Sequence, residues 1–158
     1  MATQYSLTKE KIIAAQKKWG DGIIRIGSVY LEDQDYTQAA KDHIDQLYAY
    51  DLSPVLFKPT LASKQQFRGD KESALSYFVA TNGICPEDHG FAIKPWKEVR
   101  FENENIIIHG DMALAMGNYF FSDTEGQITK VEYSFGYILD KEGDVRINLH
   151  HSSVPYAG

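Results

Sequence analysis

Three apolar runs, MALAMGNYFF (112–121), TKVEYSFGYIL (129–139) and VRINLHHSS (145–153), decide how this chain folds. In the second and third runs apolar and polar residues alternate, which is the pattern of half-buried β-strands. Two short polar segments, SDTEG (122–126) and DKEGD (140–144), separate the runs and are typical of turns between neighbouring strands. The stretch therefore predicts an antiparallel meander of three long strands, which the rest of the chain has to cover.

The residues before the meander predict mostly helices. Apolar residues recur every three or four positions from Thr8 to about Tyr30 and again from about Tyr36 to Tyr50, as on one face of a helix. Asp70 is expected to cap a third helix over residues 71–79. Short strands are expected at residues 55–59, 96–102 and 106–109, the first of them at a sheet edge because it ends in Pro59.

Three glycines interrupt the first predicted helix at positions 20, 22 and 27. Each costs about 1 kcal/mol relative to alanine in a helix interior, so a compensating feature is expected. Close packing of the helix on the sheet would supply it. A kink near Gly20 and Gly22, or two shorter helices, are the alternatives.

The order of elements places the chain in the α+β class. We expect a single domain over residues 1–158, with three N-terminal helices packed on a strongly curved antiparallel sheet that encloses a cone-shaped pocket. A hollow between a curved sheet and its covering helices is a common place for a small ligand to bind.

Composition excludes several classes of partner. No apolar run approaches the roughly 18 residues of a membrane span, so no membrane partner is expected. The formal net charge of -6, without a basic cluster, argues against nucleic acid. The N-terminus has no secretion signal, which favours the cytoplasm, although a trimmed signal would leave the same sequence.

Metal ligands and cofactor motifs are not evident in the sequence. Cys85 is the single cysteine, so a thiolate zinc site within one chain is excluded, and the histidines lack the spacing of a ligand set. The run Cys85-Pro86-Glu87-Asp88-His89 is interpreted as an exposed acidic loop, and His43 as a solvated histidine on a helix flank. We therefore expect no metal and no cofactor.

Four segments resemble the nuclear transport factor two-like superfamily of cone-shaped α+β domains. They are FKP (57–59), FRG (67–69), GDMALAMG (110–117) and VRINLHHSSVP (145–155), and the resemblance extends over nearly the whole chain. Within that superfamily the sequence looks similar to SnoaL-like polyketide cyclase and ketosteroid isomerase relatives, and to bacterial relatives of the calcium/calmodulin-dependent protein kinase II association domain. The fold hosts isomerases, dehydratases, cyclases and plain binding domains alike.

The resemblance also implies which residues face into the cone. It turns inward Ala113, Ala115, Gly117, Tyr119, Glu132, Ser134 and Gly136. The outer face would then carry an apolar patch too large to leave in water, which predicts a homodimer through that face. Its members are Leu114, Met116, Phe120, Tyr133, Phe135 and Tyr137. The alternation alone permits the reverse assignment, because a slip of one residue exchanges the two faces of a strand.

Two adjacent histidines, His150 and His151, leave opposite faces of the last strand and cannot jointly bind one ion. The resemblance turns His151 inward, which makes it the best catalytic candidate, although a purely structural histidine remains the alternative. The predicted ligand-binding residues are Tyr48, Tyr119, Glu132, Ser134 and His151.

These features favour a homo-oligomeric domain that binds a small organic or carboxylate ligand without a cofactor. The alternative is a cofactor-independent isomerase, dehydratase or cyclase that uses His151 in general acid-base catalysis.

Overall fold

The computed structural model describes residues 5–158. Residues 1–4, part of the N-terminal stretch on which the cytoplasmic expectation rests, lie outside them. The helices are α1 (Lys9–Leu31), α2 (Tyr36–Leu47) and α3 (Lys71–Val79), with a short 3-10 helix η1 (Phe91–Ile93). The strands are β1 (Leu56–Lys58), β2 (Trp96–His109), β3 (Met112–Asp123), β4 (Ile128–Leu139) and β5 (Val145–Ser153).

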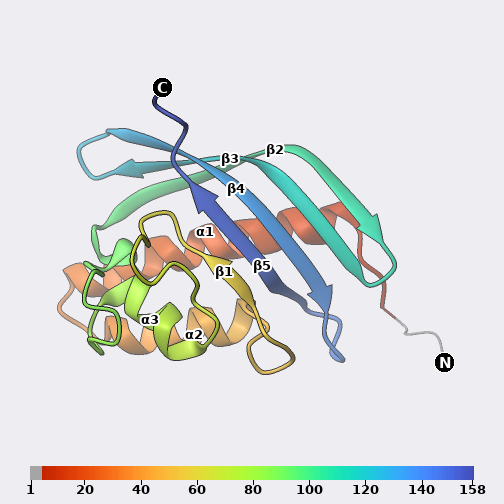
Figure 1. Ribbon diagram of the computed structural model, residues 1–158, viewed down its shortest axis with the longest axis horizontal. Coiled ribbons are helices and arrows are strands. Elements are labelled where there is room, and N and C mark those ends of the chain that lie inside the picture. The colour runs from red at the N-terminus through yellow and green to blue at the C-terminus, as the bar shows by residue number, and fades with distance from the viewer. Residues whose placement is uncertain (1–4) are drawn as a thin grey trace.

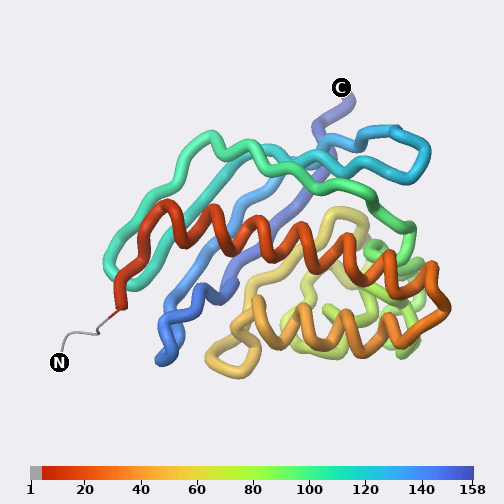
Figure 2. The backbone as a smooth tube through the Cα atoms, turned by 180° about the vertical axis from the view of Figure 1, so that it is seen from behind, coloured from red at the N-terminus to blue at the C-terminus, as the bar shows by residue number. Residues whose placement is uncertain are grey.

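The five strands form one sheet in the order β1-β5-β4-β3-β2. The sheet curves around α1, and the helices cover its concave face (Figures 1 and 2). The α+β class and the edge position of β1 are as the sequence predicted. The expectation of a wholly antiparallel sheet is corrected, because β1 pairs in parallel with β5. Tight turns fix the antiparallel direction of the meander, whereas β1 is joined to β5 only through the intervening helices and strands.

The helices begin where the sequence predicted. Thr8, Asp35 and Asp70 each accept a backbone N–H bond with their side chains at the N-termini of α1, α2 and α3. Helix α1 is continuous, so neither a break nor two shorter helices is observed.

The glycines of α1 allow close packing, as predicted. A Cβ atom at Gly20 would lie 3.2 Å from Val99 Cβ, and one at Gly27 would lie 2.8 Å from Pro95 Cβ. A Cβ atom at Gly22 would lie only 2.1 Å from Nδ1 of His43. The helix therefore approaches α2 and the segment before β2 more closely than alanine would permit without a shift, and its approach to β2 at Gly20 is tight.

Strand β2 is one long strand where the sequence predicted two. A register shift between Asn103 and Asn105 in its pairing with β3 explains the break in the alternation. The core fills the space between the concave face and the helices, and Trp19 lies among its aromatic rings. His43 belongs to this interior with 5% exposure, so its interpretation as a solvated residue is wrong. No helix within residues 5–158 is both long and apolar enough to cross a membrane.

Candidate functional site: a chamber inside the cone

The pairing of β3 with β4 decides which side chains face into the cone. Ala113, Ala115 and Tyr119 are buried on the concave face of β3, as predicted. Ala115 pairs with Phe135, and residues paired in this way share a face. The aromatic residues of β4 therefore point inward, and the inward assignment of Glu132, Ser134 and Gly136 is corrected. The small residues of β3 make room for the large rings of β4 instead of for a ligand.

The same register exchanges the roles of the two histidines. His150 pairs with Phe135 and is 2% exposed, whereas His151 pairs with Ser134 and is exposed on the outer face. The expectation that His151 lies inside the cone is therefore wrong, because the inward histidine is its neighbour His150.

The predicted site residues separate into two groups. Tyr48 and Tyr119 lie inside the cone, in contact with His150. Glu132, Ser134 and His151 line a shallow hollow of about 390 Å³ on the outer face of the sheet.

Inside the cone, His150 is the centre of a buried hydrogen-bond network. Its Nδ1 lies 2.7 Å from the Tyr48 hydroxyl, and its Nε2 lies 3.0 Å from both the Tyr119 hydroxyl and Ser152 Oγ. The Tyr119 and Ser152 hydroxyls are also hydrogen-bonded to each other. On the far side, Trp19 Nε1 donates to the Tyr48 hydroxyl at 3.0 Å.

This network favours one tautomer of His150. An indole N–H can only donate, so the Tyr48 oxygen accepts from Trp19 and its own proton is free to bond elsewhere. The acceptor within reach of that proton is Nδ1 of His150. His150 therefore carries its proton on Nε2 and presents an N–H to Tyr119 and Ser152.

Two phenyl rings enclose the imidazole. Phe57 stacks on one face of His150 at 4.8 Å between ring centroids, and Phe135 stacks on the other at 4.1 Å. Burial lowers the pKa of His150 well below its ordinary value and raises the pKa of Tyr119. Both groups are therefore neutral near pH 7, and they offer hydrogen bonds without a fixed charge.

A small chamber lies beside these groups. It offers about 10 Å³ to the centre of a water-sized molecule, which is close to the least space that one water molecule needs. Its walls are Trp19, Phe57, Thr60, Tyr77, Phe78, Phe91, Tyr119, His150 and Ser152. Thr60, Tyr77 and Phe91 also line a wider vestibule of about 710 Å³, which therefore adjoins the chamber.

Several residues of the chamber were not predicted from the sequence. His150 and Ser152 lie in the segment that carried the resemblance, so a correct strand register would have identified them. Thr60 and Tyr77 come from a loop and from α3, and no sequence pattern joins them to β5.

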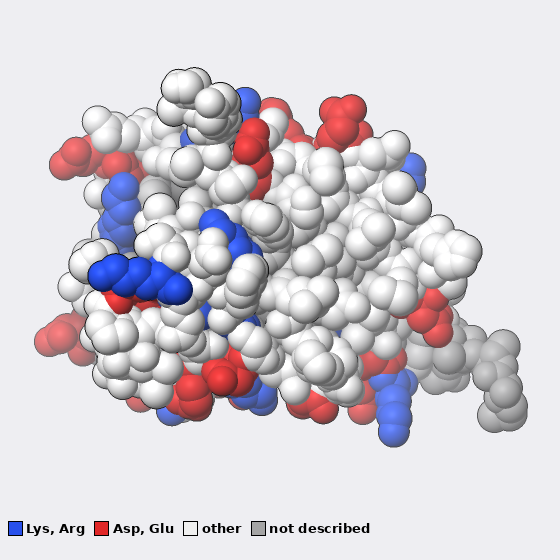
Figure 3. Space-filling view, in the orientation of Figure 1, with Lys and Arg blue, Asp and Glu red and all other residues white. Residues whose placement is uncertain are grey.

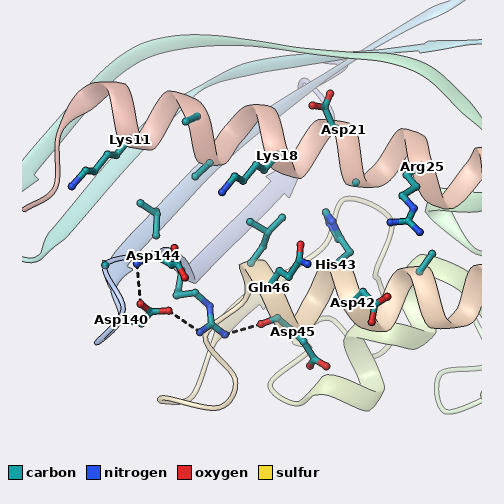
Figure 4. Close-up of a pocket in the computed structure, with 18 residues that line it drawn as sticks. Lys11, Lys18, Asp21, Arg25, Asp42, His43, Asp45, Gln46, Asp140 and Asp144 are labelled. Carbon is teal, nitrogen blue, oxygen red and sulfur yellow. Dashed lines mark hydrogen bonds and ion pairs between the residues drawn. The ribbon is translucent and has the colours of Figure 1, made fainter. Parts of the chain in front are cut away.

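A second and larger cavity, of about 790 Å³, lies between α1, α2 and the β4–β5 turn. Figure 4 shows Lys11, Lys18 and Arg25 along α1, and His43 reaching from α2 toward α1. Its opposite wall is acidic, with Asp42, Asp45, Asp140 and Asp144. Charges of both signs line this groove, and they do not converge on one point as they do around a bound ion. Within residues 5–158, no group of three or more His, Cys, Asp or Glu side chains is placed to hold a metal ion.

The fold and the buried chamber define a cone-shaped domain of the nuclear transport factor two-like class. A superfamily protein of that class from Salmonella enterica serovar Typhimurium superposes with a TM-score of 0.57 over 95% of this chain and 93% of its own, at 16% identity. This likeness shows that the chain has the fold expected from the sequence.

A family model identifies a narrower group of proteins than the sequence resemblance did. The model of the metal-independent carbonic anhydrases matches residues 10–154, and the chain belongs to that family. A metal-independent carbonic anhydrase of Nostoc sp. is 40% identical over 154 residues, which span 96% of this chain and 75% of the relative. The crystal structure of an iota-carbonic anhydrase from a cyanobacterium, complexed with bicarbonate, superposes with a TM-score of 0.95 at 37% identity, covering 100% of this chain and 98% of its own. A SnoaL-like or ketosteroid isomerase-like kinship is not what these comparisons show.

Proposed function

We propose that this protein catalyses the reversible hydration of carbon dioxide to bicarbonate in the chamber beside His150. Membership of the metal-independent carbonic anhydrase family supports this proposal, as does the bicarbonate held by the cyanobacterial relative. The observation that carries it is the chamber itself, which is small, largely aromatic and lined at one end by neutral hydrogen-bond donors.

The aromatic walls suit carbon dioxide as a substrate. The molecule is linear and carries no net charge, so it loses little by leaving water for a pocket walled by Trp19, Phe57 and Phe91. An isomerase, dehydratase or cyclase substrate is larger than this chamber, which is why we prefer carbon dioxide over those organic substrates.

The hydroxyls and the imidazole N–H stabilise the product. As water oxygen bonds to the carbon, negative charge develops on the carbon dioxide oxygens. The Nε2–H of His150 donates to one of the Ser152 and Tyr119 hydroxyls and that hydroxyl donates to the other, which leaves one hydroxyl proton to donate to those oxygens. That bond strengthens as the oxygen becomes anionic, so it lowers the barrier more than it stabilises bound carbon dioxide.

The reaction also releases a proton from the attacking water. The Nε2–H tautomer of His150 has no lone pair facing the chamber, so the imidazole acts as a donor and not as the first proton acceptor. Water in the vestibule therefore accepts this proton, on the side of the chamber bordered by Thr60 and Tyr77.

Replacement of Ser152 with alanine tests this proposal. We expect the wild-type protein to accelerate carbon dioxide hydration in a stopped-flow assay with a pH indicator, with full activity after treatment with a chelator. Ser152→Ala should reduce kcat/KM by about 10²-fold, because one donor to the developing oxyanion is lost.

Two outer-face residues provide matched controls. Ser134→Ala and His151→Ala change the same residue types on β4 and β5 but lie outside the cone, so both should retain wild-type rates. A wild-type protein that does not exceed the uncatalysed rate would contradict the proposed function. Equal losses in Ser152→Ala and Ser134→Ala would contradict the assignment of the chamber.

We also propose that two copies pair through the outer face of the sheet. Leu56, Leu149, Gly136, Leu114 and Ile107 lie side by side in one row across all five strands. Leu56, Leu114 and Ile107 are 69%, 50% and 61% exposed, and Figure 3 shows that this face carries few charged side chains. An apolar row of this length favours a partner that covers it.

A further inference from the structure

The loop between β1 and α3 is held by a carboxylate from a distant segment. Glu87 accepts backbone N–H bonds from Ser63 at 2.8 Å, from Lys64 at 3.1 Å and from Gln65 at 2.8 Å. It also accepts from the Ser63 hydroxyl at 3.2 Å. Three consecutive residues of the loop therefore donate to the one Glu87 side chain. The segment that carries Glu87 was interpreted from the sequence as an exposed acidic loop.

The neighbouring residue Asp88 holds the far end of the same loop. Arg68 is 0% exposed, and its Nη1 and Nη2 donate to the two Asp88 carboxylate oxygens at 2.7 and 2.8 Å. Two of the three remaining guanidinium N–H groups are also used, because Nε donates to Gln65 O and Nη1 to Ser73 O. Asp88 accepts a further bond from Ser76 Oγ at 2.6 Å, which ties it to α3.

This network adjoins the chamber on two sides. Thr60, at the start of the loop, lines both the chamber and the vestibule, and Leu61 N donates to the Tyr77 hydroxyl at 3.3 Å. Tyr77 follows Ser76 on α3 and is another wall of the chamber. The Glu87 and Asp88 contacts thus lie close to both residues that border the chamber mouth.

Stability alone is a weak reason for such a network. A buried ion pair loses much of its Coulomb attraction to desolvation, and well-packed apolar residues often replace one without loss of stability. What the network supplies is a fixed geometry, because four of the five N–H groups of Arg68 and three successive N–H groups of the loop are satisfied together in one arrangement.

We propose that Glu87 is a positioning residue that, together with the Arg68–Asp88 pair, holds Thr60 against Tyr77 at the mouth of the chamber. The role rests on the proposed function, since the chamber is where carbon dioxide would react. Glu87 lines the vestibule but not the chamber, and both of its carboxylate oxygens accept hydrogen bonds from the loop, so it acts on turnover through the loop. Release of the loop displaces Thr60, and a displacement near 1 Å is enough to slow a reaction in a fixed site.

Three variants separate this role from a general effect on the fold. Glu87→Ala removes every acceptor, Glu87→Gln keeps one side-chain oxygen, and Glu125→Ala removes one exposed carboxylate from the β3–β4 turn as a control for charge. We expect Glu87→Ala to lower kcat for carbon dioxide hydration by about tenfold or more. Glu87→Gln should recover part of that loss, while KM changes little and Glu125→Ala matches the wild type.

Two measurements follow the loop without using activity. Trypsin should cleave after Lys64 at least several-fold faster in Glu87→Ala than in the wild type, because the bonds at Ser63 to Gln65 are gone. The Thr60 methyl and Tyr77 ring resonances should shift in Glu87→Ala and stay in place in Glu125→Ala.

The outcomes distinguish this role from the proposed function. Unchanged Thr60 and Tyr77 resonances, or a released loop with undiminished kcat, would overturn the positioning role. A wild-type protein without hydration activity whose Thr60 and Tyr77 resonances still shift in Glu87→Ala would retain the structural role and remove the proposed function.

Discussion

His43 is a buried imidazole among aromatic rings, next to Trp19 and Phe78. Burial lowers its pKa from 6.5 to about 3, and the pKa of His150 is lowered by the same cause. In the unfolded chain both residues take up a proton near pH 6.5, whereas in the folded chain they stay neutral to lower pH. Between those values the unfolded state binds more protons, so the free energy of unfolding must fall as pH decreases below about 6.5.

The variant His43→Asn tests this linkage. Between pH 5.5 and 4, the difference in free energy of unfolding between wild type and variant should shrink by about 1.4 kcal/mol for each unit that the pH falls. The reason is that the wild type takes up a proton at position 43 on unfolding and the variant does not. Urea unfolding at several pH values measures it. A difference that stays constant across this range would show that His43 titrates normally in the folded protein.

Single residues mark the limit of what the sequence could predict. The prediction of one inward and one outward histidine was correct, but the choice between His150 and His151 depended on strand register. Register follows from the pairing of β4 with β3 and β5, which the alternation of one strand does not contain. Thr60 and Tyr77 could not be predicted from the sequence, because they join the site only when the loop folds onto α3.

At the scale of elements, the contact between α1 and α2 depends on a missing side chain. A methyl group at Gly22 would overlap the His43 imidazole, which could move aside only by losing its ring contacts with Trp19 and Phe78. Gly22→Ala should therefore destabilise the protein by about 1–3 kcal/mol, even though alanine is the better helix former.

A double-mutant cycle identifies the cause of that loss. In the background of His43→Ala, the imidazole is absent and the same Gly22→Ala substitution should cost little or become favourable. Urea unfolding of the four proteins measures the coupling. Independent effects at the two positions would show that the two helices do not meet through this contact.

The elements themselves were largely readable from the sequence. Helix α3 and strand β5 have the predicted bounds, because capping residues and polar turns mark their ends. Strand β2 was divided in two by the polar run at Asn103 and Asn105, which is a bulge within one strand. The small residues of β3 were interpreted as space for a ligand. They face the rings of β4, and only the assembled sheet reveals that packing.

At the scale of the whole molecule, the outer face of the sheet provides a direct test of self-association. Leu114→Asp places a charge in the middle of the apolar row without entering the core, so it should yield folded monomers. Sedimentation at micromolar concentration should show a dimer for the wild type. Ile13→Asp, a similar change at an exposed position on α1, should leave that dimer intact.

A monomeric wild-type protein would remove the proposed interface. Phe135, which the sequence assigned to the same outer face, is unsuitable for this test. It is 1% exposed and stacks on His150, so a charge there would disrupt the core and the chamber together.

The parallel pairing of β1 with β5 also affects how quickly the chamber forms when the protein folds. Tyr48 and His150 are 102 residues apart in the chain, and they meet only when β5 has docked beside β1. The hairpins of the meander and the three helices close over much shorter separations, and short loops close faster than long ones. A refolding chain should therefore regain its circular dichroism before its chamber. The delay between the return of the circular dichroism signal and the formation of the chamber would measure how long a nearly complete sheet exists without a working site.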